Sequence, residues 1–239
     1  MSKHEARTRI LAFGAGILLA GSMAPFAARA QDATPVAAAT PGVIADTPAE
    51  IVCEGDAAPK PAYGYVIENG SSTVRYHVNE KLATRGDVTA TGETQAFIGQ
   101  IVFDEAGTPL PCSRFDADLR TLKSDSSRRD NYLYNNTLET GSFPLASFVL
   151  TGVEGLDGPL LEGTETTFSL IGNFTVHGVT RQIRWDATAT RTADSLVGKA
   201  ATQFQMPQFD IIPPKVGPVL AIEETVLLEV EINATNPAP

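Results

Sequence analysis

Few residues of this chain have the chemistry needed for acid–base or nucleophilic catalysis. Beyond residue 30 there are two histidines, and we interpret His77 as a solvated strand residue and His177 as part of a turn. The sequence contains none of the G-x-S-x-G, H-E-x-x-H, C-x-x-C, Walker or Rossmann motifs. We therefore predict a protein that is not an enzyme, has no catalytic residues and requires no cofactor.

The first 30 residues have the features of an export signal. Three basic residues precede an apolar stretch over residues 10–26, and residues 28–30 read Ala-Arg-Ala, which fits the small-x-small cleavage rule. An uncleaved membrane anchor is the alternative, although the glycines and Pro25 make this stretch a poor permanent span. We expect a mature chain that starts near Gln31, has no stable membrane span and is exported to the periplasm or the extracellular space.

Charge and cysteine content narrow the choice of partners. The net charge is −10, and it becomes −13 when residues 1–30, with four basic residues and one acidic residue, are removed. Such a surface repels phosphate backbones, so we expect no nucleic-acid partner.

The only cysteines, Cys53 and Cys112, are predicted to form a disulfide in an exported protein, with two free thiols as the alternative. Two cysteines without nearby histidines cannot complete a zinc site, so no metal is predicted.

The chain divides into four segments by composition. Residues 1–30 are the predicted signal, and residues 31–62 form a linker rich in Ala, Pro and Thr that has too few large apolar side chains to fold. Residues 63–234 are the predicted domain, and residues 235–239 form a short tail.

Within the domain, apolar and polar residues alternate with a period of two, as in residues 74–79, 115–120 and 226–232. One apolar and one polar face per strand is typical of an antiparallel sheet. Seven or more such strands predict a sandwich or a barrel, and the lack of charged edges favours closure. The predicted fold class is all-β, an antiparallel barrel of about eight strands.

Residues 127–138 lack this alternation and follow Asp-Ser-Ser at 125–127, which offers helix N-caps. We predict a short helix across one end of the barrel, with Tyr132, Leu133 and Leu138 closing it.

Small residues on the inward stripes leave room inside the barrel. An interior of this size is either filled by side chains or holds one small ligand, and the periodicity leaves both readings open. The small inward residues are Ala117, Ala146, Gly172, Ala187, Ala189, Ala200 and Thr202.

Three segments resemble the YceI family of polyisoprenoid-binding, lipocalin-like proteins: residues 128–133 (Arg-Arg-Asp-Asn-Tyr-Leu), 142–148 (Ser-Phe-Pro-Leu-Ala-Ser-Phe) and 174–181 (Phe-Thr-Val-His-Gly-Val-Thr-Arg). In the last segment His177 and Gly178 form the predicted two-residue turn of a hairpin. Residues 65–78 also resemble the first hairpin of the family. The resemblance extends over residues 63–234.

This resemblance implies a lipocalin-like barrel that holds a long isoprenoid lipid, in proteins that are mostly exported and are not established as enzymes. The expected partner is therefore a long-chain isoprenoid lipid, and a homodimer is allowed. A non-enzymatic surface interaction or structural module with a filled barrel is the main alternative. The predicted ligand-binding residues are the larger side chains of the apolar stripes: Tyr76, Phe115, Leu119, Phe148, Leu150, Phe168, Leu170, Phe174, Trp185, Phe204 and Val226.

Overall fold

The computed structural model describes residues 62–111, 113–214 and 219–236. The predicted signal peptide, nearly all of the linker, Cys53 and Cys112 lie outside these residues, so the signal and the disulfide stay predictions.

The described chain is almost entirely β-structure, as the alternation predicts. Eleven strands lie on one continuous path and one more pairs beside it. The strands are β1 (Tyr63–Ile67), β2 (Thr73–Leu82), β3 (Gly86–Thr94), β4 (Phe97–Phe103), β5 (Arg114–Asp118), β6 (Lys123–Ser124), β7 (Leu145–Glu154), β8 (Thr166–Val176), β9 (Val179–Arg191), β10 (Ser195–Gln205), β11 (Val219–Ile222) and β12 (Thr225–Thr235).

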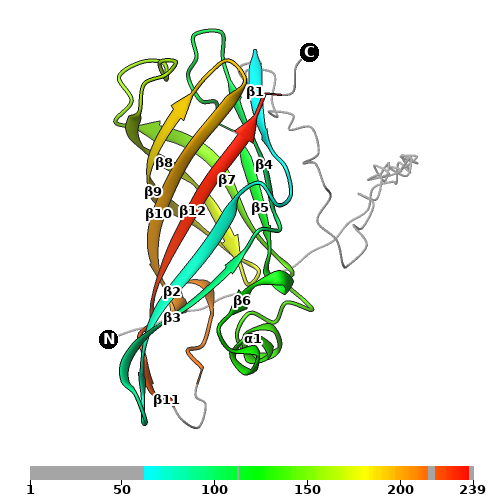
Figure 1. The fold of residues 1–239 in the computed structure, drawn as a ribbon, viewed down its shortest axis with the longest axis vertical. Helices are drawn as coiled ribbons and strands as arrows, with labels where there is room; N and C mark the ends of the chain where they lie inside the picture. The colour runs from blue at the N-terminus through cyan, green and yellow to red at the C-terminus, as the bar shows by residue number, and fades with distance from the viewer. Residues whose placement is uncertain (1–61, 112, 215–218, 237–239) are drawn as a thin grey trace, which may run out of the picture. The chain divides into compact units, whose positions relative to one another are not determined.

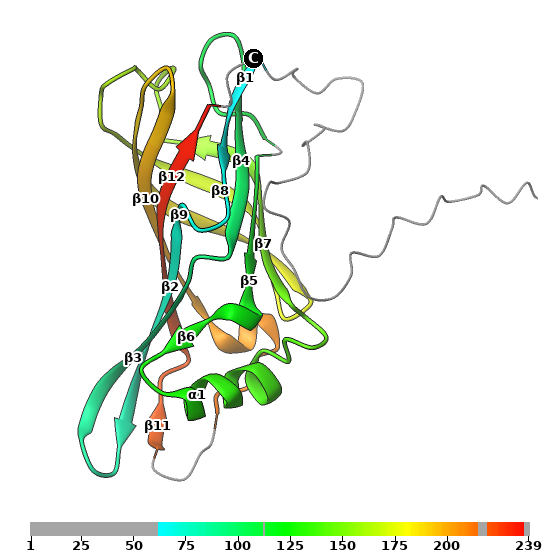
Figure 2. The same cartoon turned by 45° about the vertical axis from the view of Figure 1, so that its right-hand side comes forward.

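The sheet closes into an antiparallel barrel of eight strands (Figure 1). β1, β4, β5, β7, β8, β9, β10 and β12 follow one another around the barrel, and β1 pairs with β12 to complete it. β2, β3 and β6 extend the sheet beyond this ring at the end where the helix lies (Figure 2). The all-β barrel predicted from the sequence is confirmed.

The pairing of β1 differs from the predicted first hairpin, and that prediction is wrong. β1 pairs with β4 along its whole length and with β12 at Val66, while β2 pairs with β3 and with another part of β12. The chain between β1 and β2 crosses beside β12 instead of reversing, and Ser71 Oγ donates to the Asn233 carbonyl at 2.9 Å while the Asn233 amide donates to Ser72 Oγ at 2.9 Å. Side-chain hydroxyls thus replace ladder hydrogen bonds at this break, so β1 and β2 act as one interrupted strand.

The turn between β8 and β9 has the predicted form. Val176 pairs with Val179, and the two residues between them have positive φ angles, 52° for His177 and 74° for Gly178. Such angles at both central positions match the twist of a two-residue hairpin. The ring of Phe143 packs against His177, with ring centroids 4.9 Å apart, and holds the preceding loop against this turn.

A helical segment covers the end of the barrel where this turn lies, as predicted. The helix α1 (Ser127–Tyr132) begins after Ser126, whose side chain accepts a hydrogen bond from the Arg129 amide. It continues as the π-helical turn η2 (Leu133–Thr137). Figures 1 and 2 both place α1 below the barrel strands, beside β6.

Two short 3-10 turns complete the described structure: η1 (Leu119–Thr121) links β5 to β6, and η3 (Met206–Phe209) follows β10. Among the described residues, no helix is both long enough and apolar enough to cross a membrane. The same residues bring together no group of three or more His, Cys, Asp or Glu side chains that could hold a metal ion.

Candidate ligand cavity

The interior of the barrel contains an apolar cavity of about 160 Å³ at its helix end. Every barrel strand except β1 contributes to its wall, together with β2 and β3, and Leu133, Thr137 and Leu138 cover it from the helical segment. Nine of the eleven predicted ligand-binding residues line it, namely Tyr76, Phe115, Leu119, Phe148, Leu170, Phe174, Trp185, Phe204 and Val226.

A second, smaller cavity of about 40 Å³ lies nearer the opposite end of the barrel. It is lined by Leu150 and Phe168, the other two residues predicted to bind ligand. The structure therefore places all eleven residues on the inner wall, while their contact with a ligand stays a prediction. Four side chains line both cavities and separate them, namely Phe115, Leu170, Ala200 and Ile232.

Inward-facing glycines determine how the aromatic side chains lie on this wall. A Cβ atom added to Gly172 would fall less than 3.0 Å from the ring of Phe148, and one added to Gly99 would fall 2.6 Å from the ring of Phe115. Each ring therefore covers a glycine and lies along the sheet, a place that any larger side chain would occupy. Because the rings lie along the wall, they leave the centre of the barrel open.

Tyr76 repeats this arrangement next to the helical segment. It pairs with Gly92 across β2 and β3, and its ring covers that glycine. Burial raises the pKa of Tyr76 to about 12, although nearby Arg129 and Ser124 act in the opposite direction. The hydroxyl of Tyr76 therefore lies between the apolar cavity and a group of charged residues at the start of α1.

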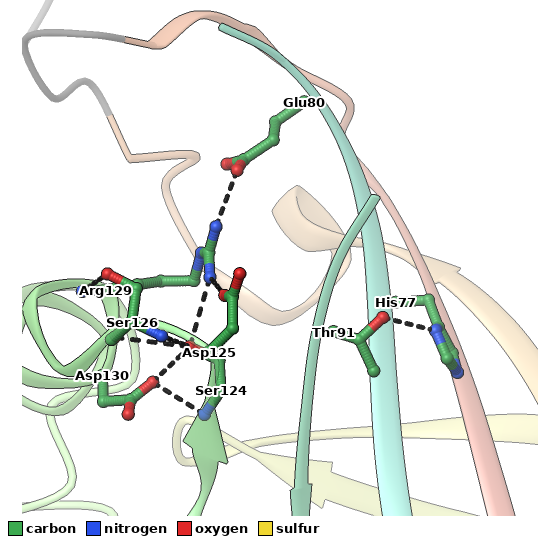
Figure 3. A network of polar contacts seen from close by, with 8 residues as sticks. All are labelled: His77, Glu80, Thr91, Ser124, Asp125, Ser126, Arg129 and Asp130. Carbon is green, nitrogen blue, oxygen red and sulfur yellow. Dashed lines mark hydrogen bonds and ion pairs between the residues drawn. The ribbon is translucent and has the colours of Figure 1, made fainter. Parts of the chain in front are cut away.

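These charged residues attach the helix to the barrel (Figure 3). Arg129 donates from Nη2 to the buried carboxylate of Glu80, in β2, at 2.9 Å, and from Nη1 to Asp125. The buried carboxylate of Asp130 accepts hydrogen bonds from the amide and the hydroxyl of Ser124, in β6, at 3.0 Å and 2.6 Å. Ion pairs and hydrogen bonds thus hold α1 against β2 and β6 at the rim of the cavity.

The two histidines occupy the positions that the sequence suggests and do not face each other. His77 lies on the outer face of β2, where Nδ1 is 2.9 Å from Thr91 Oγ1 and Nε2 is 2.8 Å from Glu229 (Figure 3 shows the Thr91 contact). His177 lies in the turn, with Nδ1 3.2 Å from the Phe209 carbonyl. Neither histidine lines either of the two cavities described above.

Comparison with known proteins agrees with this architecture. The model of the YceI-like domain family matches residues 65–234, which is more than half of the chain. The chain belongs to the YceI family. No match is found among the curated proteins.

Solved structures of family members and other proteins share the fold at low sequence identity. A polyisoprenoid binding domain from Saccharophagus degradans is 14% identical with a TM-score of 0.56, and the match covers 74% of this chain and 100% of that one. BcnA of Burkholderia cenocepacia is 13% identical with a TM-score of 0.55, covering 70% and 98%. The YCEI protein of Campylobacter jejuni is 18% identical with a TM-score of 0.51, covering 62% and 85%.

Several wall residues of this YceI-family barrel are absent from the sequence prediction. Phe97 lies in β4, which is buried on both faces and so shows no alternation. Thr137 lies in the helical segment, where its spacing of four from Leu133 places both on one helix face. Tyr132, which we expected to close the barrel, does not line the cavity, and Tyr134 instead packs against the core and donates to the Leu122 carbonyl.

Proposed function

We propose that this protein is a binding or carrier protein for a long apolar lipid, a polyisoprenoid or an isoprenoid quinone, held inside the barrel. The observation that carries the proposal is the larger cavity, whose wall is apolar on all sides and is closed by a helix attached through its own polar contacts. The Saccharophagus degradans domain, named for polyisoprenoid binding, has the same fold and supports this choice of ligand.

The size of the cavity bears on how such a lipid fits. An apolar cavity of about 150 Å³ holds a molecule such as benzene, so 160 Å³ matches only a short part of a polyprenyl chain. A longer chain has to pass Phe115 and Leu170 and join the two cavities, which share these side chains. Each buried CH₂ group of such a chain contributes about 0.8 kcal/mol, so a few isoprene units are enough for stable binding.

We further propose that the protein acts after export and performs no bond chemistry. The signal-like residues 1–30 support export, and the lack of a catalytic motif in the sequence supports a binding role. The main alternative is an interaction module on the cell surface, which requires no ligand. The open space inside the barrel favours the lipid carrier over this alternative.

Native mass spectrometry of the protein purified from its own exported fraction tests the proposal. We expect a bound mass that corresponds to a polyprenyl compound, at one molecule per chain. A protein without such a mass that also fails to extract polyprenyl lipids from vesicles would support the interaction module.

A blocked variant provides the matched control. Ala200 lines both cavities, and a tryptophan there fills the barrel, whereas Ala201 is the next residue of the same strand and faces the other side. We expect Ala200→Trp to abolish lipid extraction and Ala201→Trp to retain it. Equal extraction by both variants would place the lipid outside the barrel.

A further inference from the structure

The segment between η3 and β12 carries the two most exposed large hydrophobic side chains of the described residues. They are Ile212, with an exposed fraction of 76%, and Leu220, in β11, with 65%. Figures 1 and 2 both show β11 at the helix end of the molecule, beside the tip of the β2–β3 hairpin and away from the barrel strands. Exposed apolar side chains of this size, when they gather at one end, indicate a surface that meets an apolar partner.

The backbone after η3 explains why Ile212 is exposed. Asp210 ends η3 with a φ angle of 55°, a left-handed conformation that turns the chain and that Asp tolerates better than most residues. Ile211 then lines the larger cavity and is buried, whereas Ile212 is exposed. Pro213 follows directly and restricts Ile212 to an extended backbone conformation. Two adjacent isoleucines therefore carry apolar surface from the cavity wall to the outside.

The register of β11 explains why Leu220 is exposed. Val219 pairs with Leu82 and Ala221 pairs with the next residue of β2, so Leu220 is an extra residue with no partner on that strand. Such bulges change the direction of a side chain and interrupt the regular alternation of the strand. Two residues further on, Ile222 packs against the core of the barrel. β11 is thus attached at one end through Ile222, and its bulge leaves Leu220 outside.

The charges at the two ends of the barrel differ in sign. The hairpin tip next to β11, residues 81–87, carries exposed Lys81 and Arg85 against a single acidic residue. At the opposite end, the loop over residues 154–165 carries four acidic residues and no basic one, and it contains Leu161, whose exposed fraction is 60%. An anionic surface therefore repels the end that carries Leu161 and attracts the end that carries Ile212 and Leu220.

We propose that the helix end docks on the surface of a phospholipid bilayer, with Ile212 and Leu220 inserted among the lipid headgroups and Arg85 facing anionic ones. Binding of this kind grows with the apolar area inserted and with the attraction between basic residues and anionic lipids. Because Ile211 lines the larger cavity, docking places the cavity wall next to the inserted segment. The inference goes beyond the proposed function, since a carrier requires a cavity but no particular surface for meeting the membrane.

Sedimentation of the purified protein with vesicles of phosphatidylcholine and phosphatidylglycerol tests the docking. We expect Ile212→Glu and Leu220→Glu each to lower the partition coefficient by about tenfold, because each removes a large apolar side chain from the inserted surface. Leu161→Glu is the matched control, since it makes the same change at a similarly exposed leucine of the opposite end and should bind as the wild type does. All three side chains are exposed, so the Tm should be unchanged in each variant.

Vesicles of two compositions separate the role of charge from that of apolar insertion. Arg85→Gln should weaken binding to vesicles that contain phosphatidylglycerol by about fivefold, the effect of one basic residue near an anionic surface. The same variant should bind pure phosphatidylcholine vesicles as the wild type does, whereas Ile212→Glu should bind both kinds of vesicle less. An Arg85→Gln protein that binds both kinds as the wild type does would contradict the proposed orientation on the membrane.

The outcomes distinguish this inference from the proposed function. If the wild type takes up polyprenyl lipid but does not sediment with vesicles, the carrier stands and docking is overturned. If it sediments with vesicles and native mass spectrometry finds no polyprenyl lipid bound, docking stands and the carrier is wrong. Docking is also overturned if Ile212→Glu and Leu220→Glu sediment as the wild type does. A dimer that Leu220→Glu dissociates, in a protein that does not bind vesicles, would assign this surface to a second copy of the chain instead.

Discussion

The two ends of the barrel are built from similar residues and are packed differently. At the end opposite the helix, Tyr63 and Phe103 stack with centroids 5.2 Å apart, and Phe103 and Tyr65 are buried to 0% and 1% exposure. The Tyr65 hydroxyl donates to the Thr192 carbonyl at 2.6 Å, and Leu160 lies in the same cluster. At the helix end, the rings of Phe115 and Phe148 instead lie along the wall of the larger cavity.

The two ends differ in where their aromatic rings lie. Tyr65 and Phe103 meet edge to face at 5.7 Å, and only the smaller cavity, which Phe103 also lines, is left at this end. Phe115 and Phe148 cover Gly99 and Gly172 on the wall, and the space in front of them stays open. We therefore regard the helix end as the main ligand region, with the smaller cavity extending it towards the packed end.

Truncation of one phenylalanine at each end should give the largest change in the free energy of unfolding. Phe103→Ala removes a fully buried ring and should lower the free energy of unfolding by about 3–5 kcal/mol. Phe97→Ala removes a ring that borders the larger cavity, whereas Phe103 borders only the smaller one, so fewer contacts are lost and the decrease should be smaller. Urea unfolding of both variants measures the difference. Equal losses would contradict the distinction between a packed end and an open end.

Alkaline pH should destabilise the helix end through Tyr76. Its folded pKa, about 12, lies above the ordinary value of 10.0, so the neutral form is favoured in the folded protein. The resulting stability is fully present below pH 10 and is lost as the pH rises from 10 to 12. A difference of this size corresponds to about 2–3 kcal/mol. Urea unfolding across this pH range should show a steeper loss for the wild type than for Tyr76→Phe, and parallel curves would refute the assignment.

The sequence predicts the local features of this molecule well and misses those that depend on contacts between distant segments. Alternation identifies strands such as residues 226–232 and their inward faces, because side chains along a strand alternate between the two sides of the sheet. The His177–Gly178 turn is equally local, since it depends on two adjacent φ angles. These features are determined by neighbouring residues and are visible in the chain itself.

The features that were missed depend on contacts between distant segments. Gly172 pairs with Leu150, and only this register places it beneath the ring of Phe148. The break between β1 and β2 likewise depends on Asn233, far along the chain. The π-helical hydrogen bond from the Leu138 amide to the Leu133 carbonyl is likewise not indicated by composition. Cavity shape and ligand specificity are therefore harder to predict than the barrel.

A methyl group added to Gly172 should displace the Phe148 ring from the wall into the larger cavity. Gly172→Ala places a Cβ against the Phe148 ring and the Val149 carbonyl, and should cost about 2 kcal/mol of stability through overpacking. The displaced ring should enter the larger cavity and reduce lipid extraction. Gly152→Ala, on the neighbouring strand β7, is the control, since its Cβ would meet nothing within 4 Å. A Gly172→Ala protein that extracts lipid normally would show that the ring position does not shape the cavity.

The smallest effect we predict concerns the attachment of the helix. Arg129→Gln leaves the buried Glu80 carboxylate without its ion-pair partner, and should lower the free energy of unfolding by about 1 kcal/mol. Arg75→Gln removes the exposed ion pairs to Glu93 and Glu231 and should change it by less than about 0.5 kcal/mol. Because α1 closes only the ligand region, hydrogen exchange in Arg129→Gln should increase in residues 127–137 and remain unchanged around Tyr65. Increased exchange at both ends would mean that the helix stabilises the whole barrel, and the two ends would then form one cooperative unit.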